Sequence, residues 1–198
     1  MAVLLAPDEA GIARAAEMLR AGGLVAFPTD TVYGIGCRIG DEAALAQLFE
    51  AKRRPAEKAV PILVASPDDA RELGLEIDAG RALADRFWPG GLTLVLAGAA
   101  GSQAIRIPDH PAALALIAAS GPLATSSANR SGEPETYEAN DVLIAFADTD
   151  LLDAVLDGGR VPGGVASSVL DLTVHPPRLL REGAISRAEL EAAIGPLD

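Results

Sequence analysis

Residues 24–38 carry the sequence LVAFPTDTVYGIGCR, in which two apolar runs are joined by a polar turn. The run 24–27 ends at Pro28 and predicts a short buried strand, and 33–38 predicts a second strand beyond the turn. Open α/β sheets commonly bind ligands where strands give way to loops. The turn Pro28-Thr29-Asp30-Thr31 is therefore a candidate site, although Asp and Thr also satisfy their own backbone in simple capped turns.

Strands and helices interleave on both sides of this stretch. We predict helices over 8–20, 41–52, 79–88 and 111–119, a short helix capped by 66–69, and a last helix from Ser186 with Glu189 as its capping partner. Further strands are predicted over 60–64, 92–96, 104–107, 122–125, 154–156, 168–172 and 178–180, and 139–147 is assigned to neither class. This alternation favours a three-layer α/β fold in a single domain over 1–198.

The net charge limits the classes of partner. The chain of 198 residues has a formal net charge of -12, which argues against the broad basic face that binding to a nucleic-acid backbone requires. A small phosphate site stays compatible with this charge, because exposed charges more than about 10 Å apart are largely screened. A few Lys and Arg side chains in one pocket can therefore hold a triphosphate.

Hydropathy and cysteine content bear on the compartment. The apolar runs 92–97 and 112–119 are shorter than the roughly 20 residues of a membrane-spanning helix, and 1–7 lack a basic leader. The single cysteine, Cys37, has no second cysteine for an intramolecular disulfide. We therefore expect a soluble cytoplasmic protein with no membrane contact.

Single reactive residues and common motifs contribute little. Cys37 is interpreted as a small core residue, and His110 and His175, each followed by proline, as ordinary surface residues. The chain contains neither the Gly-x-x-x-x-Gly-Lys loop nor the Gly-x-Gly-x-x-Gly fingerprint, and no spacing typical of a zinc site. If ATP binds, it binds outside those two frameworks.

Four more candidate groups stand out, three at predicted strand or helix ends and one, Arg106, inside a predicted strand. They are Lys52-Arg53-Arg54-Pro55 with Lys58, the run 125–129, the run 181–183, and Arg106 between two isoleucines. A basic run at a helix end is often only a solvated terminus, and a Ser-Asn loop is often only a loop. Arg106 differs, because a buried guanidinium needs an anionic partner.

The order and spacing of six segments resemble the YrdC/Sua5 family, the threonylcarbamoyl-AMP synthases. The segments are Gly22–Gly36 (GGLVAFPTDTVYGIG), Lys52–Pro55 (KRRP), Trp88–Thr93 (WPGGLT), Arg106–Pro108 (RIP), Ser126–Gly132 (SSANRSG) and Leu180–Gly183 (LREG). The resemblance spans about residues 10–183 and is to the short form, without an extra C-terminal domain. It implies a three-layer YrdC/RibB-like fold with a twisted mixed β-sheet flanked by helices.

The resemblance also implies a reaction. L-Threonine, bicarbonate and ATP, with Mg²⁺ as cofactor, would give threonylcarbamoyl-adenylate and pyrophosphate for the t6A modification at position 37 of tRNA. A separate threonylcarbamoyl transferase complex would receive the product, so direct tRNA binding is expected to be weak or absent. Threonine carbamate would attack the α-phosphorus, and this step needs positioning and electrostatic stabilisation rather than a protein nucleophile.

Site residues follow by similarity to the family's motifs. Lys52, Arg54, Ser127 and Asn129 would be the catalytic group that grips the triphosphate and its Mg²⁺, which is expected to be held through the phosphates rather than by protein side chains. The ATP site would add Lys58, Ser102 and Arg181. Thr31, Arg106, Thr125 and Ser167 would line the threonine pocket, with Arg106 pairing the carboxylate bidentately. Tyr33 is expected to pack against the substrate.

Three departures and two rival interpretations accompany the resemblance. Glu135 stands where the family commonly has serine, which places a phosphate contact there in doubt, whereas Ser168 replaces a threonine and Ala59 a proline. One rival is the paralogous YciO group, whose first motif and Lys-x-Arg segment differ from those of this chain. The other is an RNA-binding module, which the negative charge disfavours.

Overall fold

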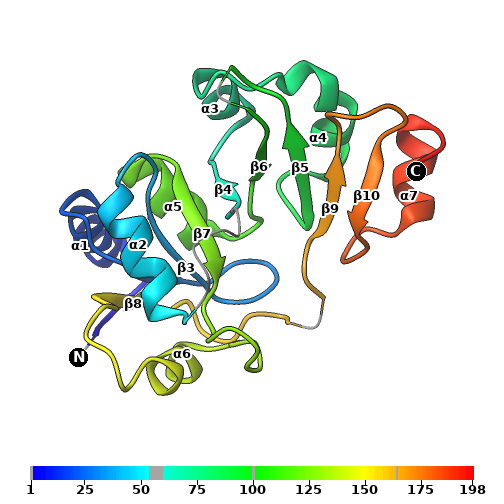
Figure 1. Ribbon diagram of the computed structural model, residues 1–198. Coiled ribbons are helices and arrows are strands. Elements are labelled where there is room, and N and C mark those ends of the chain that lie inside the picture. The colour runs from blue at the N-terminus through cyan, green and yellow to red at the C-terminus, as the bar shows by residue number, and fades with distance from the viewer. Residues whose placement is uncertain (1, 54–59, 100, 164) are drawn as a thin grey trace.

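The computed structural model describes residues 2–53, 60–99, 101–163 and 165–198 (Figure 1). In chain order the elements are β1 (Val3–Leu5), α1 (Glu9–Arg20), β2 (Val25–Phe27), β3 (Gly34–Arg38), α2 (Glu42–Ala51), β4 (Ile62–Leu63), α3 (Pro67–Glu72), the 3-10 helix η1 (Ile77–Gly80), α4 (Arg81–Phe87), β5 (Leu92–Leu96), β6 (Gln103–Arg106), α5 (Pro111–Ser120), β7 (Leu123–Ser127), α6 (Ala139–Ala145), β8 (Ala154–Leu156), β9 (Ser168–Asp171), β10 (Arg178–Arg181) and α7 (Arg187–Ile194).

The strands form one mixed sheet of ten strands in the order β1-β8-β2-β3-β7-β4-β6-β5-β9-β10. The sheet contains antiparallel pairs such as β2 with β3 and parallel pairs such as β4 with β6 and β5 with β9. The predicted α/β class with a mixed sheet flanked by helices is confirmed, and β5 has the predicted bounds. The sequence interpretation missed β1, and it assigned no element where α6 lies.

Alternating side chains pack helices onto both faces of the first part of the sheet. On β2, Val25 and Phe27 join the core formed with α1 and α5, whereas Ala26 joins the core formed with α2 and α6. The helices begin at capping side chains: the Asp8 carboxylate accepts the backbone N–H of Gly11 at 2.8 Å. These layers surround β2, β3, β7 and β8 (Figure 1).

The second part of the sheet buries one face beneath helices. Leu92, Leu94 and Leu96 of β5 pack into a core that includes Leu83 of α4 and Leu190 of α7. Because successive strand residues point to opposite faces, Thr93 points the other way. That opposite face of β5, β6 and β9 is the one that borders the cavity described below.

The single cysteine and the two histidines differ in how far they are buried. Cys37 is fully buried, as predicted, and burial raises the pKa of its thiol to about 11. His175 is exposed, but the prediction of an ordinary surface residue is wrong for His110. Its Nδ1 accepts the N–H of Ala112 at 3.2 Å at the start of α5, and partial burial lowers its pKa. Within the described ranges, no helix has the length and apolar content needed to cross a bilayer.

Candidate active site

A cavity of about 360 Å³ lies between the two parts of the sheet. Its size falls at the lower end of the range for small-molecule sites. One part of its lining comes from the β2–β3 turn and from β3, β4 and β7. The other part comes from the open face of β5 and β6 and from residues at β9 and β10. The residues are Thr29, Thr31, Val32, Gly34, Pro61, Leu63, Thr93, Ala104, Arg106, Thr125, Ser126, Ser127, Glu135, Ala166, Ser167, Val169 and Arg181.

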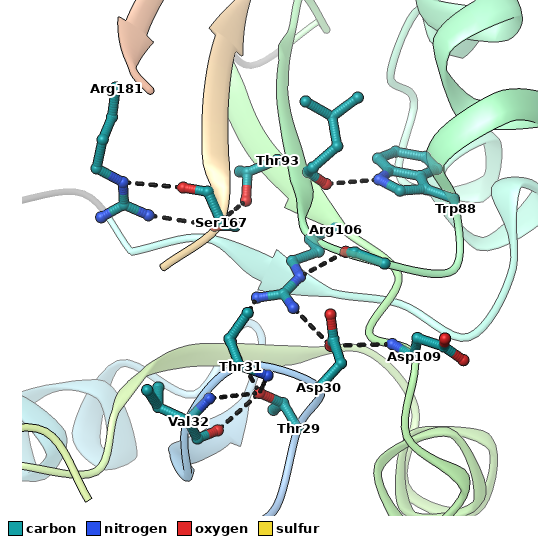
Figure 2. A network of polar contacts seen from close by, with 12 residues as sticks. Thr29, Asp30, Thr31, Val32, Trp88, Thr93, Arg106, Asp109, Ser167 and Arg181 are labelled. Atoms are coloured by element: carbon teal, nitrogen blue, oxygen red, sulfur yellow. Dashed lines mark hydrogen bonds and ion pairs between the residues drawn. The ribbon is translucent and has the colours of Figure 1, made fainter. Parts of the chain in front are cut away.

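Arg106 is fixed at one wall of this cavity by three acceptors (Figure 2). Its Nε donates to the carbonyl of Gly90 at 2.9 Å, Nη1 to Thr31 Oγ1 at 3.3 Å, and Nη2 to Asp30 Oδ1 at 2.5 Å. Arg106 ends β6 and is 7% exposed, so the requirement for a buried counter-ion is met within the protein. A guanidinium has five N–H donors, so each terminal nitrogen keeps one further N–H for a ligand.

The turn after β2 is both a capped turn and part of the site. Thr29 Oγ1 donates to the carbonyl of Val32 at 2.6 Å and accepts the N–H of Thr31 at 3.2 Å, so Thr29 holds the turn together. This arrangement directs Thr31 to the cavity and Asp30 to Arg106 (Figure 2). The two interpretations of the turn are therefore compatible.

Ser167, just before β9, and Arg181, at the end of β10, form a second polar group at the cavity (Figure 2). Arg181 Nε donates to the carbonyl of Ser167 at 2.9 Å, and Arg181 Nη2 donates to Ser167 Oγ at 3.2 Å. Ser167 Oγ also shares a hydrogen bond of 2.9 Å with Thr93 Oγ1. Arg181 is itself exposed at the end of β10, so its charge faces both the cavity and solvent.

Lys52 approaches the site from α2 and joins it to the segment after β7. The lysine is 3% exposed, and its Nζ donates to the carbonyl oxygens of Ser127 and Asn129. Asn129 Nδ2 donates to the carbonyl of Glu133 at 2.7 Å. The buried Asn129 Oδ1 has no hydrogen-bond partner among the described residues.

The structure unites most of the predicted site residues. Six of them line the cavity: Thr31, Arg106, Thr125, Ser127, Ser167 and Arg181. Lys52 binds the backbone carbonyls of both Ser127 and Asn129 and so connects these two residues. Arg54 and Lys58 lie outside the described residues. Ser102 is exposed and is not among the lining residues.

Tyr33 has a different position from the one predicted. Its side chain is fully buried away from the cavity lining, and its hydroxyl donates to the carbonyl of Gly159 at 2.8 Å and accepts the N–H of Gly158 at 3.1 Å. It therefore anchors the segment that connects β8 to β9. Burial raises the pKa of Tyr33 to about 12.

Sequence reasoning gave no role to Asp30 or Thr93, although both stand in quoted segments. Thr93 could have been found as the one hydroxyl in an otherwise aliphatic strand, on the face opposite the leucines. Asp30 carried no comparable signal, because its partner is 76 residues away. Glu135 was noted as a departure, and it is one of the residues that line the cavity.

This arrangement suits a ligand with several anionic groups. Two guanidinium groups, Arg106 and Arg181, face one cavity with the hydroxyl groups of Thr31, Thr125, Ser127 and Ser167. Guanidinium groups bind carboxylates and phosphates in a planar, bidentate fashion. Among the described residues no cluster of His, Cys, Asp and Glu could hold a metal ion on its own.

Known proteins resemble this chain along its length. A family model of the Sua5/YciO/YrdC domain, described as "Telomere recombination", matches residues 17–183. The threonylcarbamoyl-AMP synthase of Pyrococcus abyssi is 43% identical over 95% of this chain and 58% of the relative. That of Bacillus subtilis is 39% identical over 98% of this chain and 59% of the relative. The chain thus spans less than two thirds of the length of these two relatives.

A solved structure supports the same likeness. The crystal structure of Pyrococcus abyssi Sua5 complexed with L-threonine is 40% identical to this chain and superposes on it with a TM-score of 0.90. The superposition covers 100% of this chain and 62% of that one. This chain therefore has the fold of an experimental structure that contains L-threonine.

Proposed function

Because this chain belongs to the Sua5/YciO/YrdC family, we propose that it is an enzyme that makes threonylcarbamoyl-AMP from L-threonine, bicarbonate and ATP, with release of pyrophosphate. One observation carries the proposal. The predicted lining residues come from five separate segments of the chain, at Thr31, Arg106, 125–127, Ser167 and Arg181, and converge on one cavity with two guanidinium groups and several hydroxyls, as expected for a site that holds an amino acid beside a nucleotide.

Arg106 would bind the threonine carboxylate. Its contacts with Gly90, Thr31 and Asp30 fix the plane of the guanidinium and leave one N–H on each terminal nitrogen, which suits a bidentate carboxylate. Thr31, Thr125 and Ser167 supply hydroxyl groups at the same cavity. The threonine complex of the Pyrococcus abyssi relative supports L-threonine as the ligand class.

The nucleotide would extend from Ser127 toward Arg181. Lys52, Arg54 and Lys58 would also bind its phosphates. Asn129 fits a role at Mg²⁺, because its buried Oδ1 lacks a partner among the described residues and hard cations prefer oxygen ligands. Bound Mg²⁺ would neutralise charge on the phosphate oxygens. Glu135, also at the cavity, would repel those phosphates.

The reaction balances without a protein nucleophile. The amine nitrogen of threonine first forms a bond to the bicarbonate carbon and water leaves, which gives threonine carbamate. A carbamate oxygen then forms a bond to the α-phosphorus, and the bond from that phosphorus to the oxygen bridging to the β-phosphate breaks. Pyrophosphate leaves with the electron pair. The protein contributes by holding the two anions in contact and by placing cationic donors where charge develops. We infer that the adenylate passes to a transferase complex that modifies tRNA, that direct tRNA binding is weak or absent, and that the protein works in the cytoplasm.

Pyrophosphate release tests this function. Purified protein with threonine, bicarbonate, Mg²⁺ and ATP should release pyrophosphate only when threonine and bicarbonate are both present, and mass spectrometry should detect the adenylate. Arg54→Ala should nearly abolish release, whereas Arg14→Ala, which changes an exposed arginine of α1 paired with Glu17 at 3.2 Å, should not. Threonine-independent turnover would indicate another acyl acceptor, and tight RNA retention without turnover would support an RNA-binding module.

A further inference from the structure

Arg130 is a buried arginine that the proposed chemistry does not use. It follows Asn129 directly, is 5% exposed and is not among the cavity-lining residues. Its Nε donates to the carbonyl of Ala145 at 3.1 Å, Nη1 to the carbonyl of Ala51, and Nη2 to the Asp148 carboxylate. The guanidinium also lies over the ring of Phe146, 5.2 Å from its centroid. All three nitrogen atoms are therefore engaged.

Two of these acceptors are the last residues of helices. Ala51 ends α2 and Ala145 ends α6. The final carbonyl groups of a helix have no partner within it, and a cation near them is favourable. Arg130 therefore joins the C-terminal ends of two helices with one planar group, which a lysine ammonium could not do.

The contact between α2 and the segment 127–131 also runs in the opposite direction. Lys52, next to Ala51, donates through Nζ to the carbonyls of Ser127 and Asn129, and the N–H of Ser131 donates to the carbonyl of Lys52 at 3.0 Å. The Lys52 side chain thus binds the carbonyls of Ser127 and Asn129. In return, the Arg130 side chain binds the carbonyl of Ala51 and the Ser131 N–H binds the carbonyl of Lys52. We call this set of four contacts the reciprocal clamp.

We propose that Arg130 is a positioning residue that fixes Lys52 and the Ser127–Asn129 segment relative to each other for binding the phosphates of ATP, an inference that rests on the proposed function. Arg130 acts through Lys52 and Asn129 and touches no ligand itself. Asp148 is the outer anchor of the reciprocal clamp, because its side chain is 56% exposed and also accepts from Arg53 Nη2 at 2.6 Å.

Steady-state kinetics of Arg130→Gln, Arg130→Lys and Asp148→Asn test the proposal. Loss of the guanidinium should raise KM for ATP by about tenfold to a hundredfold, because small misplacements of binding groups are costly, while KM for threonine stays unchanged. Arg130→Lys should keep most of that defect. Asp148→Asn, which removes only a half-exposed anchor, should raise KM for ATP by about two- to fivefold.

Two controls separate positioning from simple loss of stability. Leu19→Ala removes a buried side chain of α1 that has no part in the reciprocal clamp, and should lower Tm without changing KM for ATP. Arg160→Gln removes an arginine that also pairs with a carboxylate, Glu138 at 3.3 Å, and lies over an aromatic ring, and should leave KM for ATP unchanged. Equal effects of Leu19→Ala and Arg130→Gln on KM for ATP would overturn the proposal.

Direct binding of ATP distinguishes failure of this inference from failure of the proposed function. Calorimetric titration with ATP and Mg²⁺, without threonine, should show Kd raised in the Arg130 variants by the same factor as KM. If the natural protein binds ATP but makes no adenylate, the proposed function fails and the Kd comparison still decides the role of Arg130. Full recovery by Arg130→Lys, or a lowered kcat with KM and Kd for ATP unchanged, would contradict the positioning role.

Discussion

Asp30 and Arg106 form a largely buried ion pair at one wall of the cavity, with 2.5 Å between Asp30 Oδ1 and Arg106 Nη2 and side chains that are 17% and 9% exposed. The same Asp30 oxygen accepts the N–H of Asp109 at 3.0 Å. One carboxylate therefore joins the β2–β3 turn to the end of β6 and to the loop that follows it (Figure 2). A threonine carboxylate at Arg106 would be a second anion beside the first.

Replacing the Asp30 carboxylate should make the thermal stability of the protein depend more strongly on bound threonine. Asp30→Asn leaves Arg106 without its anion and should lower the free energy of unfolding by about 3 kcal/mol. Threonine should then raise Tm more in the variant than in the natural protein, because its carboxylate supplies the missing charge. Threoninamide, which has no carboxylate, is the control in the same thermal scan. Equal threonine-induced shifts in the two proteins would argue against binding of the carboxylate by Arg106.

Local features were predictable because their causes are local. The caps at Asp8 and at Ser186 with Glu189 lie where polar residues precede helical periods, and β5 keeps its predicted bounds between a glycine pair and a turn. β1 was missed, since its three half-exposed residues at the sheet edge are too few to show a period. The fold class followed from the alternation of elements.

The contacts of the site residues were not predictable in the same way. The resemblance identified Arg106 and Lys52, but most of their partners in this structure are distant in sequence. Asp30 and Thr31 bind Arg106, two backbone carbonyls bind Lys52, and each is at least 75 residues away. Such pairs depend on how the two parts of the sheet pack together, and the hydrophobic periodicity of the sequence does not predict this packing. Tyr33 shows the same limit, because a motif position does not state which way a side chain points.

Glu135 should weaken ATP binding. Glu135 is a lining residue of the cavity, where a negative charge would repel phosphates, so Glu135→Gln should lower KM for ATP by about two- to fivefold, with a larger effect at low ionic strength. Glu133→Gln makes the same charge change two residues away at an exposed position outside the lining, and should have little effect. Comparable changes in both variants would indicate a general effect of net charge instead.

Thr93 should act on threonine binding through Ser167. Thr93→Val keeps the shape but removes the hydroxyl that shares a 2.9 Å hydrogen bond with Ser167 Oγ. A hydrogen bond of about 0.5–1.5 kcal/mol corresponds to a rise in KM for threonine of about two- to twelvefold. The double variant with Ser167→Ala should be no worse than Ser167→Ala alone, because the two hydroxyls act together. Additive losses in this double-mutant cycle would exclude the coupling.

Tyr33 should make the fold sensitive to alkaline pH. Burial raises the pKa of its phenol to about 12, whereas an unfolded tyrosine titrates near 10, so between these values the unfolded chain releases a proton that the folded chain keeps. The contribution of Tyr33 is complete below pH about 10 and declines as pH rises toward 12, by up to about 2–3 kcal/mol. Tyr33→Phe removes the bridge to Gly158 and Gly159 and should cost about 1–3 kcal/mol at neutral pH, but it should also remove this decline.

Urea denaturation at pH 8, 10 and 11.5 measures both effects of Tyr33→Phe. The comparison is made in a Cys37→Ala background, because the Cys37 thiol, with a pKa of about 11, loses its proton in an overlapping range. The difference in free energy of unfolding between the proteins with and without Tyr33→Phe should narrow with rising pH, since the phenol at position 33 can lose a proton on unfolding and phenylalanine cannot. A constant difference across the three pH values would show that the buried phenol is not the source of the alkaline sensitivity.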